Sequence, residues 1–302
     1  MAGFRDAIRL VTPFEIRRKL LNTRFALRKQ TSFLRVLPDF MIIGTMRGGT
    51  SSLFKYLGSH PLVIPSLRKE TWYFSNQKCY KRGVDWYRTH FPTRQFKRCL
   101  ELIKGHNPLT FEASANYLDH PDAAIRAAGI LPNVKLIVML RNPVDRLYSH
   151  YMYNYQRGVE KRSLDEIVNE GIRFIDQNNG RLERSDHGRA IEKAFMYIYI
   201  GLYAEHLQNW LTYFPKENLL ILSSEDFFKQ TADIYQRIVT FLHLPSWRPK
   251  QFRNYSHWGR KRTDNKSAPS MESSMRQDLL RWYAPHNERL FQMIGQDFQW
   301  ND

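Results

Sequence analysis

The sequence lacks several features that would assign it quickly to a class of protein. Only two cysteines, Cys79 and Cys99, occur in 302 residues, whereas a secreted protein held by disulfides normally carries more. We expect both to be reduced. No stretch approaches the roughly 20 consecutive apolar residues of a membrane-spanning helix, and no apolar segment near residue 1 resembles a cleavable signal peptide. These absences favour a cytoplasmic protein.

Acidic residues are also scarce. Asp and Glu number 29 against 46 Lys and Arg, a formal charge of +17. Such an excess favours an anionic ligand, a nucleic acid or an acidic membrane surface, without choosing among them. The histidines lack the spacing of a metal site, so we expect no metal. They stand at scattered positions, among them His60, His90, His106, His120 and His150.

Part of the basic excess lies in residues 1–37, where apolar side chains recur at helical spacing and Pro13 forms a break. We interpret this segment as a basic amphipathic N-terminal arm, and 38–302 as one domain. The arm has three possible roles: packing on its own domain, adsorption to an anionic membrane surface, or contact within an oligomer. We favour the first.

Beyond Pro38, short apolar runs alternate with helical patterns. The runs at 39–44, 133–141 and 218–227 predict buried strands. Asn142 is expected to cap the helix after the second strand, and Ser163 with Glu166 predicts a capping box. Helices are expected from Thr50 to Gly58 and over 121–130, 163–172, 189–213, 231–243 and 271–295. This alternation predicts an α/β domain with a central parallel sheet flanked by helices.

The segment "GTMRGGTS", 44–51, follows the first strand and opens a helix. Such a turn aims free backbone N–H groups and the positive end of the helix at one point, which suits an anion. Gly48 and Gly49 remove side chains that would keep oxygens away, while Thr50 and Ser51 add hydroxyl donors. An ordinary tight turn between strand and helix is the alternative.

The comparison with the nucleotide loop G-x-x-x-x-G-K-[ST] fails in an informative way. Gly44 and Gly49 have its spacing, but Thr50 stands where that motif has lysine, and a cation has moved to Arg47. Nucleotide-hydrolysing enzymes hold magnesium with an acid after a second strand, and here that strand ends in Arg141. We therefore expect an anion bound without magnesium. A P-loop kinase and a non-catalytic basic protein that binds nucleic acid or membrane remain alternatives.

Several ordered stretches between Asp39 and Trp300 resemble the sulfotransferases that use 3′-phosphoadenosine 5′-phosphosulfate (PAPS). The resemblance is to the branch containing the heparan sulfate glucosaminyl sulfotransferases and their bacterial relatives. It implies a P-loop-like sulfotransferase fold. The stretches are "IIGTMRGGTSSLFKYLGSHP", "KETWYFS" (69–75), "GVDWYRTHFP" (83–92), "LIVMLRNPVDRLYSHY", "LQNWLTYFPKENLLIL", "NKSAPSM" and "IGQDFQW".

The resemblance implies a role for several residues. Glu70 aligns with the catalytic glutamate and would accept the proton of the acceptor. Arg47 stands where the family usually has a lysine at the leaving phosphate; it keeps the charge but cannot donate a proton. Arg141 and Ser149 match the pair that binds the 3′-phosphate. The other expected donor contacts are Gly48, Gly49, Thr50, Ser51 and Ser52 in the loop, and Arg260, Arg262 and Lys266 in a basic lid.

The acceptor is less well defined. Heparan-modifying relatives carry a lysine where this chain has Ala113, which weakens heparan sulfate as a substrate. We expect a bacterial-type enzyme that sulfates a hydroxyl or amine of a carbohydrate, lipid or secondary metabolite by direct in-line displacement, releasing adenosine 3′,5′-bisphosphate. Glu70, Tyr117 and His120 are the candidate acceptor contacts. No nucleic acid is expected as a partner, and the arm is a candidate for peripheral membrane contact.

Overall fold

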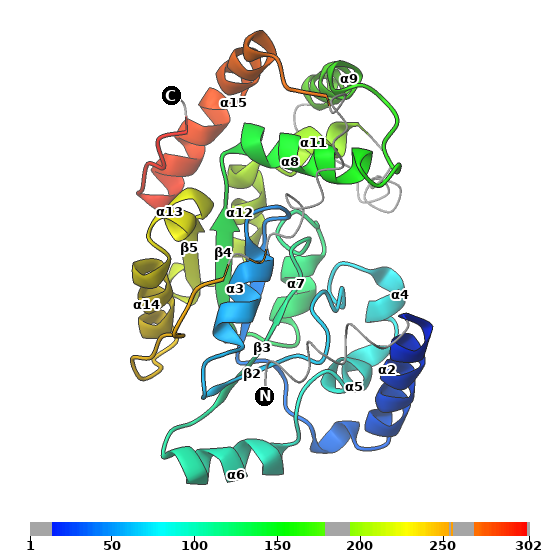
Figure 1. Ribbon diagram of the computed structural model, residues 1–302, viewed down its shortest axis with the longest axis vertical. Helices are drawn as coiled ribbons and strands as arrows, with labels where there is room; N and C mark the ends of the chain where they lie inside the picture. The colour runs from blue at the N-terminus through cyan, green and yellow to red at the C-terminus, as the bar shows by residue number, and fades with distance from the viewer. Residues whose placement is uncertain (1–13, 179–193, 254, 256–268, 301–302) are drawn as a thin grey trace.

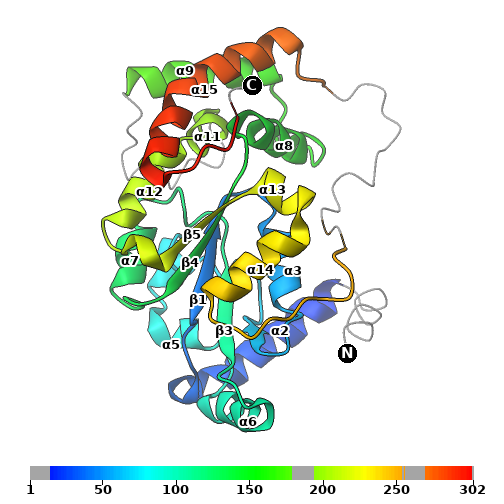
Figure 2. The ribbon, with the colours of Figure 1, turned by 90° about the vertical axis from the view of Figure 1, so that its left-hand side faces the viewer.

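A five-stranded parallel sheet is the frame of the molecule (Figures 1 and 2). The computed structural model describes residues 14–178, 194–253, 255 and 269–300. The strand order is β2-β3-β1-β4-β5, so β1, the first strand in the sequence, lies in the middle. The strands are β1 (Phe40–Gly44), β2 (Val63–Pro65), β3 (Leu109–Ala113), β4 (Lys135–Leu140) and β5 (Leu219–Ser223).

The two faces of the sheet are covered by different helices. Met41 and Ile43 of β1 belong to one buried cluster with residues of α5 (Gly83–Arg88), α7 (Ala123–Ala128) and α12 (Tyr203–Leu211). Phe40 and Ile42 belong to the opposite cluster, with α3 (Thr50–Leu57) and α14 (Thr231–Phe241). Alternate side chains of a strand point to opposite faces, so the unbroken apolar run of β1 suits a strand buried on both sides.

A third apolar cluster lies beyond the carboxyl ends of the strands. It joins four helices: α8 (Pro143–Tyr155), α9 (Leu164–Gln177), α11 (Phe195–Tyr199) and α15 (Ser273–Ile294). Figure 1 shows them together at the top of the molecule, above the sheet. The carboxyl edge of the sheet is therefore enclosed from above, and this is the edge where open α/β sheets bind ligands.

The α/β class and its three expected strands are confirmed, but several details differ. β2 and β3 were not predicted: β2 has three residues, and β3 carries a buried glutamate, Glu112. The strand expected over 218–227 ends at Ser223, where α13 (Ser224–Lys229) begins. The single helix expected over 189–213 is wrong for its described part, because α11 and α12 are separated at Gly201. A Cβ there would lie 2.8 Å from the Tyr283 hydroxyl.

The described part of the N-terminal arm packs against the domain. Its helix α2 (Phe14–Lys29) ends near Arg28, whose guanidinium donates to the carbonyls of Thr89 and Phe91. Arg35, which follows the short helix η1 (Ser32–Leu34), also donates to the Phe91 carbonyl, at 3.1 Å. Burial, with Arg35 nearby, lowers the pKa of Arg28 to about 10.

Of two further helices, α4 (Gln77–Tyr80) lies beside α2 and α6 (Arg94–Lys104) lies at the lower end of the molecule (Figure 1). Across the described ranges, no helix is both long enough and apolar enough to cross a membrane.

Candidate active site

The loop between β1 and α3 is held closely against its neighbours. Gly48 accepts a hydrogen bond from the Ser224 hydroxyl at 3.0 Å, and a Cβ on Gly48 would lie 2.7 Å from the Met139 carbonyl oxygen of β4. Gly49 precedes α3 with φ of 93°, a conformation that favours glycine. Among the described residues, no acceptor bonds the N–H groups of Thr50 and Ser51. The start of α3 therefore offers hydrogen-bond donors to an anion.

Three of the predicted site residues meet at this edge of the sheet. The Nε of Arg47 donates to the Ser149 hydroxyl at 3.1 Å, and Arg141 donates to the Arg47 carbonyl at 3.3 Å. The Arg47 guanidinium also lies over the Tyr153 ring, 5.0 Å from its centroid. Burial, followed by the charge of Arg141, lowers the pKa of Arg47 from its ordinary value.

No carboxylate within the described ranges bonds the guanidinium of Arg47 or Arg141. Two arginines that repel each other and lack an acidic partner form a site that is prepared for an anion. The described residues also contain no cluster of His, Cys, Asp and Glu that would hold a metal ion.

The remaining loop residues differ in exposure. Thr50 and Ser52 are buried, whereas Ser51 is exposed. The Ser52 side chain bonds Tyr56, on its own helix. Ser51 is therefore the hydroxyl of this group that solvent or a ligand reaches most easily. The predicted lid residues Arg260, Arg262 and Lys266 lie outside the described residues.

The neighbouring strand end positions Glu70. Its N–H donates to the carbonyl of Ala113, the last residue of β3, at 2.8 Å, and its carboxylate accepts from the Ala115 N–H at 3.0 Å. The other carboxylate oxygen pairs with Lys69. Glu70 adopts φ of 61°, in the left-handed region. Because β3 lies beside β1, this carboxylate belongs to the same edge of the sheet as the loop.

A buried carboxylate that the sequence analysis did not identify supports this arrangement. Glu112 of β3 is fully buried and accepts hydrogen bonds from the hydroxyls of Tyr87 (2.6 Å), Thr71 (2.7 Å), Ser114 (2.8 Å) and Tyr117 (3.0 Å). Burial raises its pKa. The network ties Thr71, which directly follows Glu70, to β3. The sequence feature that could have revealed Glu112 is an acidic residue within a largely apolar run, "LTFEA".

Two of the predicted acceptor contacts, Tyr117 and His120, make hydrogen bonds within the protein. Tyr117 is completely buried, and its hydroxyl bonds Glu112 and Thr71. It is therefore unavailable to an acceptor, and its assignment was wrong. His120 is partly exposed; its Nδ1 accepts from the Asp122 N–H at 3.2 Å.

The hydrogen bonds of the cap after β4 tie the end of the chain to the site. The Asn142 side chain accepts from the N–H of Val144 at 3.0 Å, as expected of a helix cap, and donates to the Trp300 carbonyl at 3.2 Å. The Trp300 indole donates to Glu225 at 3.3 Å. The carboxyl edge of β4 is thus held by two distant parts of the sequence, at Glu225 and Trp300.

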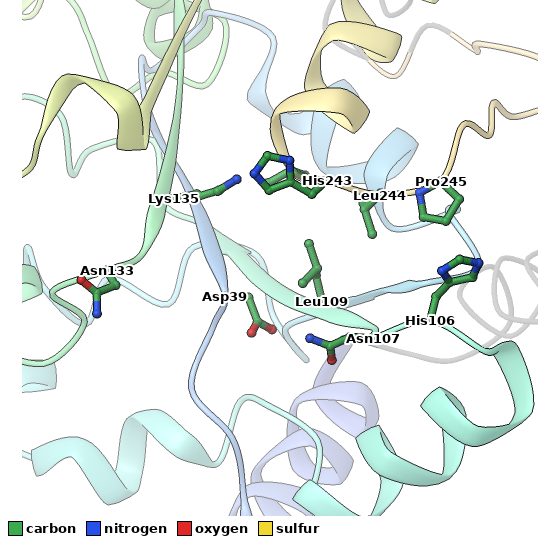
Figure 3. Close-up of a pocket in the computed structure, with 10 residues that line it drawn as sticks. Asp39, His106, Asn107, Leu109, Asn133, Lys135, His243, Leu244 and Pro245 are labelled. Atoms are coloured by element: carbon green, nitrogen blue, oxygen red, sulfur yellow. The ribbon is translucent and has the colours of Figure 1, made fainter.

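A cavity of about 340 Å³ lies at the opposite, amino edge of the sheet (Figure 3). Its charged side chains have local partners: Asp39 accepts from Lys97 and from the Thr110 N–H, and Lys135 donates to the Phe241 carbonyl. This cavity is therefore separate from the arginine site and carries no spare charge for a ligand.

The fold and site define a class: an α/β domain whose glycine loop lies beside two arginines that have no acidic partner among the described residues, with no acid after the second predicted strand. Residues 37–301 match the family model described as "Sulfotransferase domain", and the chain belongs to this family.

Three relatives illustrate the range of the similarity. Mouse heparan sulfate glucosamine 3-O-sulfotransferase 6 is 31% identical over 289 residues, covering 88% of this chain and 75% of the relative. Human bifunctional heparan sulfate N-deacetylase/N-sulfotransferase 3 is 30% identical, and the match covers 85% of this chain but only 30% of the relative. The crystal structure of a sulfotransferase from Alicyclobacillus acidocaldarius superposes with a TM-score of 0.64 at 26% identity, covering 88% of this chain and all of the other.

Proposed function

We propose that this protein is a PAPS-dependent sulfotransferase that transfers a sulfuryl group to a hydroxyl or amine of a small molecule or glycan. The observation that carries the proposal is the cluster of Arg47, Arg141 and Ser149 at the start of α3, where two guanidiniums have no acidic partner in the described structure. Such a set of donors fits a nucleotide with separate anionic groups at its 3′ and 5′ positions.

Each residue has a distinct part in this proposal. Arg47 and the N–H groups of Gly49, Thr50 and Ser51 hold the 5′ end and stabilise charge on the leaving phosphate. Arg141 and Ser149 hold the 3′-phosphate, which distinguishes PAPS from ATP. When bound, PAPS supplies the sulfuryl group and the leaving phosphate. Arg47 remains an electrostatic contact, because an arginine is a poor proton donor.

Glu70 is the proposed general base. The Ala115 N–H fixes one carboxylate oxygen at 3.0 Å and Lys69 compensates its charge, so the carboxylate is held ready to take the proton of the attacking hydroxyl or amine. A positioned base of this kind contributes about 10²- to 10⁴-fold in rate. The acceptor attacks directly in line, and no covalent intermediate on the protein is needed.

The acceptor is proposed to be something other than heparan sulfate, because Ala113 replaces the expected lysine. Of the acceptor contacts considered above, Glu70 and His120 are kept in the proposal. The scarcity of cysteine supports a cytoplasmic location, and the basic arm supports peripheral contact with a membrane. Cell fractionation tests both statements.

Thermal melting with three nucleotides tests the donor site. We expect adenosine 3′,5′-bisphosphate at about 100 times its dissociation constant to stabilise the fold by about 2.7 kcal/mol, with AMP giving less. ATP with magnesium should also give less. If ATP with magnesium stabilises as well or better, the kinase alternative replaces the proposal. If none of the three binds, the basic non-catalytic alternative takes its place.

A further inference from the structure

A second cavity, of about 400 Å³, lies directly beside the segment that carries Glu70. Its volume falls within the range of about 300–1,000 Å³ typical of small-molecule sites. We call it the basic aromatic pocket. It is lined by Phe25 of α2, by Arg68, Thr71 and Trp72, by Lys78, Cys79 and Arg82, and by Trp86 and His90.

The inner part of this pocket is aromatic and uncharged. The His90 ring packs against Trp86 and Phe25, with centroids 4.7 Å and 4.8 Å apart. Burial lowers the pKa of His90 to about 4, so the ring is neutral at physiological pH. Its Nδ1 lies 3.1 Å from the Tyr87 carbonyl, which only accepts, so Nδ1 is the donor. Such an interior suits a planar ring or the apolar face of a sugar.

The outer part of the pocket is cationic. The Arg68 guanidinium lies 4.9 Å from the Trp72 ring centroid, and that of Arg82 lies 5.1 Å from Trp86. Lys78 is the third cation, and none of the residues lining the pocket is acidic. Among the described residues, no carboxylate forms an ion pair with any of the three. Stacking on a ring leaves the edge of a guanidinium available to an anion.

The backbone links this pocket to Glu70. Both Glu70 and Trp72 have positive φ, 61° and 56°, which is costly for residues with side chains and is common at functional sites. Thr71 between them is anchored to Glu112 at 2.7 Å. In this conformation the Glu70 carboxylate reaches the Ala115 N–H while Trp72 lines the pocket.

We propose that the basic aromatic pocket is the acceptor subsite, and that the acceptor carries an anionic group on or beside a ring. The ring packs against Trp72, Trp86 and Phe25, while Arg68, Arg82 and Lys78 bind the carboxylate, sulfate or phosphate. This inference rests on the proposed function, because Glu70 must act on the acceptor that the pocket holds.

Matched acceptors that differ in charge test this inference. With PAPS, the protein is given p-nitrophenyl β-D-glucuronide or the neutral β-D-glucoside, and 4-hydroxybenzoate or 4-hydroxybenzamide, and release of adenosine 3′,5′-bisphosphate is measured. We expect kcat/KM to favour the charged member of a pair by about tenfold or more. In the double variant Arg68→Gln/Arg82→Gln, this ratio should fall towards one. Arg237→Gln, an exposed arginine of α14, is the control and should keep the ratio.

A binding measurement makes the test independent of turnover. Glu70→Gln protein with adenosine 3′,5′-bisphosphate is titrated with the same pairs by calorimetry, and we expect tighter binding of the charged members. Equal binding within both pairs, or a preference that the double variant retains, would overturn the acceptor subsite. If the bisphosphate itself causes no melting shift, the proposed function has failed, and the inference fails with it.

An independent observation concerns helix α6, which has no buried residue. Its Phe96, Leu102 and Ile103 side chains are 55%, 75% and 76% exposed. Thr93 caps the start of the helix by accepting from the Phe96 N–H at 3.2 Å, and Gly105 closes it with φ of 69°. Lys97 ties its polar side to Asp39. The sequence therefore builds this helix without packing its apolar side against the described domain.

A second exposed apolar pair adjoins α6. Phe33 and Leu34 of η1 are 64% and 43% exposed. Arg35, next to them, forms an antiparallel bridge with Thr93, the cap of α6. Figure 1 shows α6 and the end of the arm at the same lower end of the molecule. We call Phe33, Leu34, Phe96, Leu102 and Ile103 together the α6 face.

The charges of α6 identify the partner of this face. Arg94, Arg98 and Lys104 stand against one acid, Glu101, while Lys97 pairs with Asp39. Arg24 and Lys29 of α2 are further exposed basic residues. Exposed apolar side chains among basic ones are typical of binding to anionic membranes. We infer that the α6 face docks on an anionic membrane surface.

Vesicle flotation tests the membrane contact. We expect the protein to float with vesicles of phosphatidylcholine and phosphatidylglycerol, but not with phosphatidylcholine alone. Phe96→Ser/Ile103→Ser should abolish flotation, whereas Ile125→Ser, an exposed apolar residue of α7, should not. Unchanged flotation of the double variant would overturn the inference. So would concentration-dependent dimerisation that the double variant abolishes, since the occupant would then be a second copy of the chain.

Discussion

Substitution of Arg141 by alanine gives a quantitative test of the 3′-phosphate site. In the free protein, the guanidinium makes one hydrogen bond to the described residues, to the Arg47 carbonyl at 3.3 Å. Its loss should cost the fold only about 0.5–1.5 kcal/mol. A hydrogen bond to a charged group is worth about 1.5–3 kcal/mol, so the bisphosphate should bind about ten- to a hundredfold more weakly.

The melting shift follows from these values. At a bisphosphate concentration about 100 times the wild-type dissociation constant, the ligand stabilises the wild type by about 2.7 kcal/mol, and the variant by about 0.4–1.4 kcal/mol. At about 2 °C per kcal/mol, these values correspond to shifts of about 5 °C and 1–3 °C. Each shift is measured by differential scanning fluorimetry as the difference in melting temperature between the protein with ligand and the same protein without it.

AMP is the matched ligand because it lacks the 3′-phosphate. Its smaller shift should be the same in wild type and Arg141→Ala, since Arg47 and the start of α3 are retained. Arg237→Ala should respond to both ligands like the wild type. A variant that keeps the full bisphosphate shift, or loses the AMP shift equally, would refute the assignment of Arg141 to the 3′-phosphate.

Three further predictions concern other parts of the site. Glu70→Gln should keep the bisphosphate melting shift while turnover falls by about 10²- to 10⁴-fold; unchanged turnover would exclude Glu70 as the base. Gly48→Ala should lower the melting temperature and weaken binding of the bisphosphate, because the new Cβ would lie 2.7 Å from the Met139 carbonyl oxygen. The control Gly129→Ala should be tolerated, because the nearest atoms to its Cβ are 3.6 Å or more away. Burial on folding lowers the pKa of His90 from 6.5 to about 4. The neutral ring therefore contributes about 3 kcal/mol to the free energy of unfolding above pH 6.5, and this contribution is lost as the pH falls from 6.5 to 4. Urea unfolding of wild type and His90→Gln should therefore converge as the pH approaches 4, and a constant difference would contradict this.

The part of the fold that depends on local sequence pattern was predictable. β1, β4 and β5 are apolar runs buried in the sheet, and Asn142 and Ser163 cap helices as expected. β3 was missed because its carboxylate makes the pattern look unsuitable for a buried strand. The hydroxyls that hydrogen-bond to Glu112 come from positions up to 41 residues away, so the local sequence does not reveal them.

The candidate site also has a part that the local sequence predicts and a part that depends on tertiary structure. Arg47 and Arg141 follow from the rule that ligands bind where parallel strands end, but the bond from Arg47 to Ser149 spans 102 residues and depends on the placement of α8. Tyr117 was misassigned because a tyrosine near the expected acceptor also suits a buried hydroxyl network. The basic aromatic pocket combines Phe25 of the arm with α4 and α5, so only tertiary structure reveals it.

The central position of β1 has a consequence for synthesis of the chain. Its partners β3 and β4 end at Ala113 and Leu140, whereas β1 ends at Gly44, so 140 − 44 = 96 residues separate β1 from the end of its second partner. At about 5–20 residues per second, the ribosome needs roughly 5–20 s to supply that length. Until then the run Phe40–Gly44 has at least one unpaired edge, and a nascent-chain chaperone that covers apolar segments would shield it during this interval.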